Sequence, residues 1–184
     1  MRPGFAIHVS AMKPAELISK VKSGDVEALA EIYARYSRSL MATAYRLTGN
    51  VADAEDVLHD VFLGLPEALR QYDERGTAES WLKRLTARVA LSRIRSRAQR
   101  RESSIGEEPS LDRHASSPIN DDWLVRRAID SLPEPLREVF VLKEMEGYSH
   151  SEIASMLGIT VANSEVRLHR AVKALRIRLA PKIQ

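Results

Sequence analysis

The stretch EIASMLGITVANSEVRLHRAVKALRIRLA, residues 152–180, decides how the C-terminal part of this chain folds. Apolar residues recur at helical spacing on both sides of Gly158, and Ser149 followed by Glu152 is the signature of an N-terminal capping box. A short helix, a glycine-containing turn and a longer basic helix starting at 160–161 form a helix-turn-helix, whose second helix enters the major groove of DNA. The pattern therefore predicts a DNA-binding motif.

The second helix of this motif has a predicted buried face and a predicted outer face. Its helical phase indicates a buried stripe of Val161, Leu168, Ala171, Val172, Leu175 and Leu179. Candidate DNA contacts are Asn163, Ser164, Arg167 and Arg170 on a shared outer face, with Glu165, His169 and Lys173 beside them. Arginine can bond guanine and asparagine adenine, whereas Glu165 either favours the helix dipole or accepts from a cytosine amino group. The alternative is a helical bundle with a solvated arginine face.

Charge is sharply segmented along the 184 residues, although the net charge is only +3. Residues 81–101 hold eight basic side chains and no acidic one, and residues 102–121 are rich in serine, proline and acids. The latter segment has little apolar content to bury and reads as a flexible acidic linker. With 44% hydrophobic residues, we predict an all-α chain of two small helical domains, 15–101 and 122–184, after a loose extension at 1–14.

The N-terminal domain is predicted to hold three main helices. Start and stop signals at 23–25 and 49–50 bound a long amphipathic helix. Its apolar stripe is Leu29, Ile32, Tyr33, Tyr36, Leu40, Ala44 and Leu47. The next helix buries Val57, Leu58, Val61, Phe62 and Leu65. Pro66 is expected to end or kink that helix near Leu65, and Trp81 to open a third, basic helix.

An acidic cluster on the second of these helices has two interpretations. Asp56 with Asp60, and Glu55 with His59, have the i,i+4 spacing that can place two ligands on one metal, as a metal hydrolase would need. A catalytic metal requires further convergent ligands, and the other histidines lie in the tail, the linker or the second domain. The pattern favours a solvated or partner-binding face, with no metal and no cofactor.

The basic helix also has two interpretations, a solvated surface or a nucleic-acid surface. Cations without compensating acids repel one another, and an external polyanion removes that cost. Aromatic and polar groups at Tyr72, Arg75, Thr77 and Trp81 precede the cations, and such a surface can stack on an unpaired strand. The absence of cysteine and of a signal peptide or membrane-spanning stretch predicts a cytoplasmic protein with no membrane insertion.

Taken in order, these segments resemble the extracytoplasmic-function type of bacterial RNA polymerase sigma factor, a compact class of the sigma-70 family. The resemblance runs from about Gly24 to Leu179. It rests on DAEDVLHDVF (53–62), YDERGTAESWLKRLTARVALSRIRSR (72–97), SLPEPLREVFVLKEMEGYSHSEIASMLGI (131–159) and RLHRAVKAL (167–175). The resemblance implies a non-enzymatic subunit that binds core RNA polymerase, melts promoter DNA and directs transcription initiation at a specific regulon.

The resemblance also implies a role for each candidate surface. The residues that would dock onto the clamp helices of the largest polymerase subunit are Asp53, Glu55, Asp56, His59, Asp60 and Phe62. The polymerase flap is a further expected contact of the chain. The residues that would bind the minus-ten element are Tyr72, Arg75, Thr77, Trp81, Lys83, Arg84, Arg88, Arg93 and Arg97. Recognition of the minus-thirty-five element is assigned to the candidate DNA contacts of the helix-turn-helix named above. An anti-sigma factor is a further partner that the resemblance suggests.

The chain departs from the usual family pattern at a few positions. His59 stands where glutamine is usual, and Pro66 where an aromatic residue is usual. Val89 and Ser92 replace a common asparagine and aspartate. Residues 162–165, Ala-Asn-Ser-Glu, replace Gly-Thr-Val-Lys in the recognition helix. A stand-alone helix-turn-helix regulator, which would bind duplex DNA without polymerase, is the alternative function.

Overall fold

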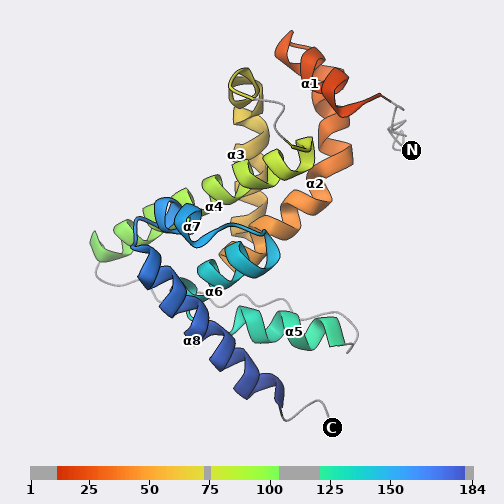
Figure 1. Ribbon diagram of the computed structural model, residues 1–184. Coiled ribbons are helices and arrows are strands. Elements are labelled where there is room, and N and C mark those ends of the chain that lie inside the picture. Colours follow the sequence, from red (N-terminus) through yellow and green to blue (C-terminus); the bar gives the residue numbers. More distant parts are fainter. Residues whose placement is uncertain (1–11, 73–75, 104–120, 181–184) are drawn as a thin grey trace.

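The computed structural model describes residues 12–72, 76–103 and 121–180 (Figure 1). In these ranges the chain forms α1 (Pro14–Lys22), α2 (Val26–Thr48), α3 (Val51–Arg70), α4 (Ala78–Ser103), α5 (Asp121–Asp130), α6 (Glu134–Phe140), the π-helical η1 (Val141–Met145), α7 (His150–Leu157) and α8 (Val161–Leu179). The all-α prediction is confirmed. Most of the predicted extension, most of the predicted linker and Arg75 lie outside the described residues. None of the helices in these ranges has the length and apolar character needed to cross a bilayer.

Helix α2 is the central helix of the N-terminal domain, and it begins and ends where the sequence indicated. The Asp25 side chain accepts hydrogen bonds from two backbone N–H groups of the first turn. Gly49 ends the helix with φ of 69°, a conformation that costs glycine little. Leu40 and Leu47 of the predicted stripe are fully buried, but Tyr33 is 48% exposed, so its placement in the stripe is wrong.

Helices α3 and α4 differ from their expected bounds. Helix α3 continues through Pro66 for another turn, so of the two expected outcomes, an end or a kink near Leu65, the end is wrong. Pro66 itself is exposed, while Leu65 and Leu69 are buried. Burying two leucines contributes about 3–6 kcal/mol, which offsets the roughly 3 kcal/mol cost of an interior proline. Helix α4 begins at Ala78, before the expected start at Trp81.

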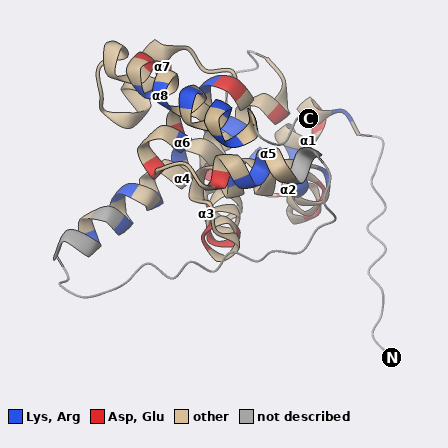
Figure 2. Cartoon of the chain, turned by 90° about the horizontal axis from the view of Figure 1, so that it is seen from below, with Lys and Arg blue, Asp and Glu red and all other residues tan. Residues whose placement is uncertain are grey.

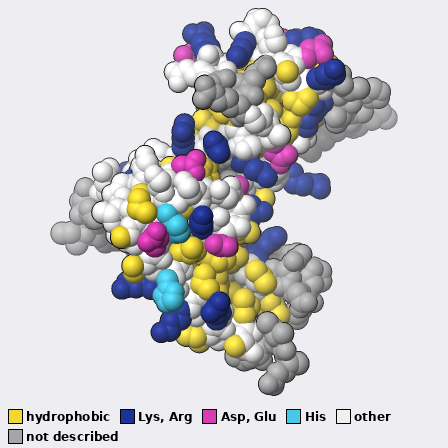
Figure 3. Space-filling view, viewed as in Figure 1, with side chains coloured by type: hydrophobic (Ala, Val, Ile, Leu, Met, Phe, Trp, Pro, Cys, Tyr) yellow, Lys and Arg dark blue, Asp and Glu magenta, His cyan; other side chains and the backbone are white. Residues whose placement is uncertain are grey.

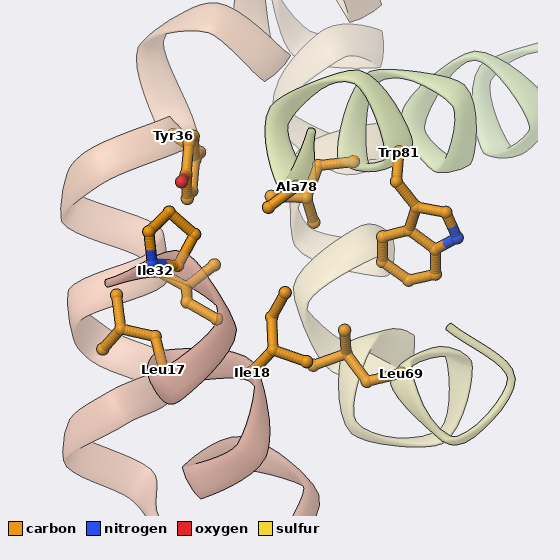
Figure 4. Close-up of a pocket in the computed structure, with 9 residues that line it drawn as sticks. Leu17, Ile18, Ile32, Tyr36, Leu69, Ala78 and Trp81 are labelled. Atoms are coloured by element: carbon orange, nitrogen blue, oxygen red, sulfur yellow. The ribbon is translucent and has the colours of Figure 1, made fainter. Parts of the chain in front are cut away.

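Helix α1 is an element that the sequence reading missed. Its residues Leu17, Ile18 and Val21 are buried, and the helix packs against α2 and α3. In Figure 4 the side chains of α1 and Trp81 of α4 line a small apolar pocket. The helical pattern of α1 is only two turns long, which is too short to be distinguished from an extension by periodicity.

The C-terminal domain contains the predicted helix-turn-helix, formed by α7 and α8. Ser149 and Glu152 form the predicted capping box at the start of α7. Gly158 ends α7 with φ of 66°, and the Thr160 side chain caps α8. Helix α8 packs against α5, α6 and α7, and Figure 1 shows it running along the lower edge of the molecule.

Replacing Leu17 with alanine tests whether α1 belongs to the core. We expect Leu17→Ala to lower the free energy of unfolding by about 2–4 kcal/mol, because the fully buried side chain would leave a cavity. Urea denaturation followed by circular dichroism measures the change. Ser19→Ala, an exposed position of the same helix, is the control, and equal stability of the two variants would contradict the packing of α1.

Candidate nucleic-acid and partner interfaces

The acidic residues of α3 form ion pairs with the basic helix α4. Arg93 bridges two carboxylates, binding Asp56 at 2.7 Å and also Asp60. Arg97 binds Asp53. Figure 2 shows acidic positions on α3 and basic positions along α4. Two predicted sites, one for a protein partner and one for DNA, are therefore joined to each other in this structure.

These pairs correct the expectation that the cations of α4 lack compensating acids. Lys83 also pairs with Glu79 within α4, at 3.2 Å. The compensating carboxylates come mainly from another helix, so the sequence of α4 alone could not reveal them. The charges of Arg93 and Arg97 are thus partly neutralised. Repulsion among the basic residues of α4 is therefore weaker evidence that this helix binds a polyanion.

A second surface of α3 faces away from these ion pairs. Glu55 and His59 are exposed there. The Phe62 ring packs on Tyr33 of α2, with 4.8 Å between ring centroids, and Leu63 beside it is 69% exposed. An acid, a histidine and three apolar side chains make a mixed surface of the kind that binds protein partners. Sequence reasoning missed Tyr33 and Leu63 as part of it.

The residues before the basic helix are held in place by contacts within the domain. Trp81 is half-buried and meets Tyr72 edge to face, with 5.0 Å between ring centroids. Lys22 of α1 lies 5.8 Å from the Tyr72 ring centroid. Thr77 caps α4, because its hydroxyl accepts from the Ser80 N–H at 3.1 Å. The structure brings these three candidate residues together at the start of α4.

Three other cations of α4 lie on the side opposite to Arg93 and Arg97. With 3.6 residues per turn, Arg84, Arg88 and Arg95 share one stripe. Arg84 lies over the Tyr148 ring at 5.8 Å, and Arg95 donates to the Met156 carbonyl oxygen at 2.9 Å. Both partners belong to the C-terminal domain, and Figure 1 shows α7 beside α4. Arg95 was not among the candidate residues.

The outer face of α8 carries most of the predicted groove contacts. Exposed candidates are Asn163, Glu165, His169, Arg170 and Lys173. The Arg167 side chain is half-buried and donates from Nε to the Asn163 side-chain oxygen at 3.0 Å. Figure 3 shows basic, acidic and histidine side chains mixed over the surface of α7 and α8. Such a surface has donors for both phosphates and base edges.

Two assignments in α8 are wrong. Ser164, expected on the outer face, is fully buried, and Val161, expected in the core, is 43% exposed. Ser164 lies in one helical stripe with Leu168, Ala171 and Leu175, a spacing that could have identified it. Its hydroxyl bonds His150 Nδ1 at 2.8 Å, which satisfies the buried oxygen and ties α7 to α8. Ser164 and His150 therefore set the geometry of the motif, and Ser164 does not face the groove.

A buried carboxylate lies behind the recognition helix. Burial raises the pKa of Glu138 on α6 to about 7, the nearby Glu134 adds to the rise, and Arg167, Arg137 and Arg95 oppose it. The capping carboxylate of Glu152 is different, because hydrogen bonds from Ser149 lower its pKa. Sequence reasoning had no signal for Glu138, since its burial depends on the packing of α6.

Metal-ligating groups do not converge within the described ranges. No group of three or more histidine, aspartate or glutamate side chains there is arranged to hold an ion. Asp56 and Asp60, one of the two pairs that suggested such a site, bind Arg93.

Comparisons with known proteins relate both parts of the chain to one family. The family model described as Sigma-70 region 2 matches residues 32–100, and the model described as Sigma-70, region 4 matches residues 122–175. The ECF RNA polymerase sigma factor SigE of Mycolicibacterium smegmatis is 32% identical over 82% of this chain, which spans 61% of that relative's length. SigM of Mycobacterium tuberculosis, also an ECF sigma factor, is 32% identical over 90% of this chain and 82% of its own.

A solved structure shares the fold. It contains the sigma factor RpoE in complex with the anti-sigma factor NepR from Bartonella quintana. The TM-score is 0.60 at 20% identity, over 83% of this chain and 97% of that one.

Glu138 predicts a dependence of stability on pH. Because the folded-state pKa of about 7 lies above the ordinary glutamate value of 4.5, the folded chain binds more protons between these two values, and stability falls as pH rises through this window. We expect Glu138→Gln to be more stable than the parent by up to about 3 kcal/mol at pH 8 and equal to it at pH 4. Urea denaturation across this range measures it, with the exposed Glu144→Gln as control. If the free energy of unfolding changes with pH in the same way for the parent and Glu138→Gln, the raised pKa of Glu138 is contradicted.

Proposed function

Because the chain belongs to the extracytoplasmic-function sigma factors of the sigma-70 family, which direct transcription initiation by RNA polymerase, we propose that it docks on core polymerase through α3 and contacts promoter DNA through α4 and α8. Sigma factors are non-catalytic specificity subunits, so no reaction is assigned to this chain. The observation that carries the proposal is the pair of family matches, to region 2 over α2–α4 and to region 4 over α5–α8. Neither the stand-alone regulator nor the metal hydrolase is retained.

The docking surface for core polymerase centres on Glu55, His59 and Phe62. These residues lie on the face of α3 that is not bound to α4, and Tyr33 extends the surface onto α2. Asp53, Asp56 and Asp60 are partly occupied by arginines but keep exposed carboxylate surface, so they act at the edge of the contact. The clamp helices of the largest subunit are the proposed partner, with the flap as a contact of the C-terminal domain.

Promoter DNA contacts divide between the two domains, for which the bounds 15–101 and 122–184 are kept as a proposal. In the first domain, α4 and its N-terminal aromatic residues take the melted minus-ten strand, because Trp81 and Tyr72 offer stacking surfaces beside cations. In the second domain, the outer face of α8 enters the major groove at the minus-thirty-five element, where Arg170 and Asn163 can meet base edges. Ser164 is excluded from this set.

An anti-sigma factor is a proposed regulator. The RpoE structure that shares this fold was solved with the anti-sigma factor NepR, and in this chain Glu55 and His59 are exposed to a partner. Because the proposed partners are polymerase and promoter DNA, we place the protein in the cytoplasm.

Mixing the purified protein with core RNA polymerase tests the docking proposal. We expect co-elution and promoter-dependent transcription, and Glu55→Arg should weaken core binding about tenfold or more by placing a cation at the centre of the surface. The matched control is Glu27→Arg, an exposed glutamate on α2. Failure of the parent chain to bind core polymerase would refute the function, and equal binding by both variants would place the docking surface elsewhere.

Glu165→Lys tests base reading by α8. Glu165 lies beyond the first turn of the helix, so its benefit to the helix dipole is small. We expect the variant to bind duplex DNA more tightly overall and to change its base preference about tenfold at one position, since a cytosine acceptor is lost. Selection from a randomised duplex library measures both effects. If Glu165→Lys and the control Glu144→Lys tighten binding equally with unchanged preference, Glu165 reads no base.

A further inference from the structure

The two domains meet at the carboxyl end of α2, where Arg137 of α6 is inserted. Its Nε donates to the Leu47 carbonyl oxygen at 3.3 Å, and its terminal nitrogen donates to that of Thr48 at 3.4 Å. Arg137 is only 8% exposed. A cation here satisfies carbonyls that have no partner inside the helix and favours the helix dipole. Gly49 permits the approach, because a Cβ there would lie 3.1 Å from the Arg137 guanidinium carbon.

A buried carboxylate makes the second contact between the domains. Glu146, which follows η1, accepts hydrogen bonds from the Thr43 hydroxyl and from Arg46, each at 3.0 Å. Its side chain is 5% exposed. A charge so shielded from water is costly unless it is paired, so the position of Glu146 depends on α2 of the other domain. The Tyr45 hydroxyl donates to Asp130 nearby, at 3.3 Å.

These contacts place the C-terminal domain beside α4, where Arg84, Arg88 and Arg95 stay exposed. Arg84 lies over the Tyr148 ring and Arg95 binds the Met156 carbonyl. Arg84 and Arg88 belong to the surface proposed above for the minus-ten strand. The same packing brings the helix-turn-helix beside α4, so the two proposed DNA-binding surfaces are neighbours in this structure.

Promoter DNA requires a different arrangement. Elements centred near positions minus ten and minus thirty-five are separated by roughly 85 Å along B-form DNA, at about 3.4 Å per base pair. Surfaces whose side chains touch cannot reach both elements at once. The domain contact must therefore open when the promoter is engaged.

We propose that Arg137 and Glu146 form a latch, defined by their contacts with Leu47, Thr48, Thr43 and Arg46, that keeps the free protein closed, with the proposed DNA-binding surfaces of α4 and α8 beside each other. The inference rests on the proposed function of α4. Opening removes these contacts, and it also gives water access to the buried Tyr148 hydroxyl, which has no hydrogen-bond partner among the described residues. The closed state therefore combines stabilising and destabilising contacts, which suits an equilibrium that a partner can shift.

Distances between spin labels test whether the latch closes the free chain. The chain has no cysteine, so Leu63→Cys and Ile177→Cys, at positions 69% and 66% exposed, place one label on each domain. We expect one narrow distance distribution in the otherwise unchanged chain. Glu146→Ala and Arg46→Ala, on opposite sides of the latch, should each broaden it and shift it to longer distances. Circular dichroism verifies that both variants keep their helices.

Two matched controls change the same charges outside the latch. Glu144→Ala removes an exposed glutamate adjacent to Glu146, and Arg38→Ala removes an exposed arginine of α2. Both should leave the distance distribution unchanged. A broad distribution in the unchanged chain, or equal broadening by latch and control variants, would overturn the latch.

Discussion

The carboxyl end of α2 imposes the constraint on which the arrangement of the two domains depends. The last carbonyl groups of any helix lack partners within that helix and need donors from elsewhere when they are buried. Gly49 supplies one N–H to the Tyr45 carbonyl, and Arg137 supplies donors to the carbonyls of Leu47 and Thr48. One helix end therefore serves both as the boundary of α2 and as the docking point of the C-terminal domain.

Charge on α3 and α4 has a structural use that precedes any use in binding. The three aspartates of α3 hold Arg93 and Arg97, which fixes one face of α4 and leaves the opposite face for other contacts. Exposed ion pairs are individually weak, so they orient the helix more than they stabilise it. Because of this division, Glu55 and His59 remain open to a partner, whereas Asp53, Asp56 and Asp60 are shared.

The helix-turn-helix is positioned by polar contacts as well as by its apolar stripe. Ser164 and His150 form a buried hydrogen bond between the two helices, and the capping box and Gly158 set the ends of α7. Apolar packing alone tolerates small rotations of a helix, whereas a buried donor and acceptor need one geometry. The residues that would meet DNA are therefore presented at a fixed angle.

The sequence by itself determined the elements whose signals are local. Helical periodicity, the Asp25 and Ser149 caps and the turn glycines specify most helices without reference to distant residues, and the exposed arginines of α8 follow from the same phase. Short α1 was missed because two turns carry too little periodicity, and the continuation of α3 through Pro66 was missed because the burial of Leu65 and Leu69 outweighs the local effect of proline. The inward position of Ser164 was missed although its helical spacing indicated it. Only the tertiary structure decided which charges are paired, how deeply Glu138 is buried and where Arg137 is inserted, since each depends on residues far apart along the chain that packing brings together.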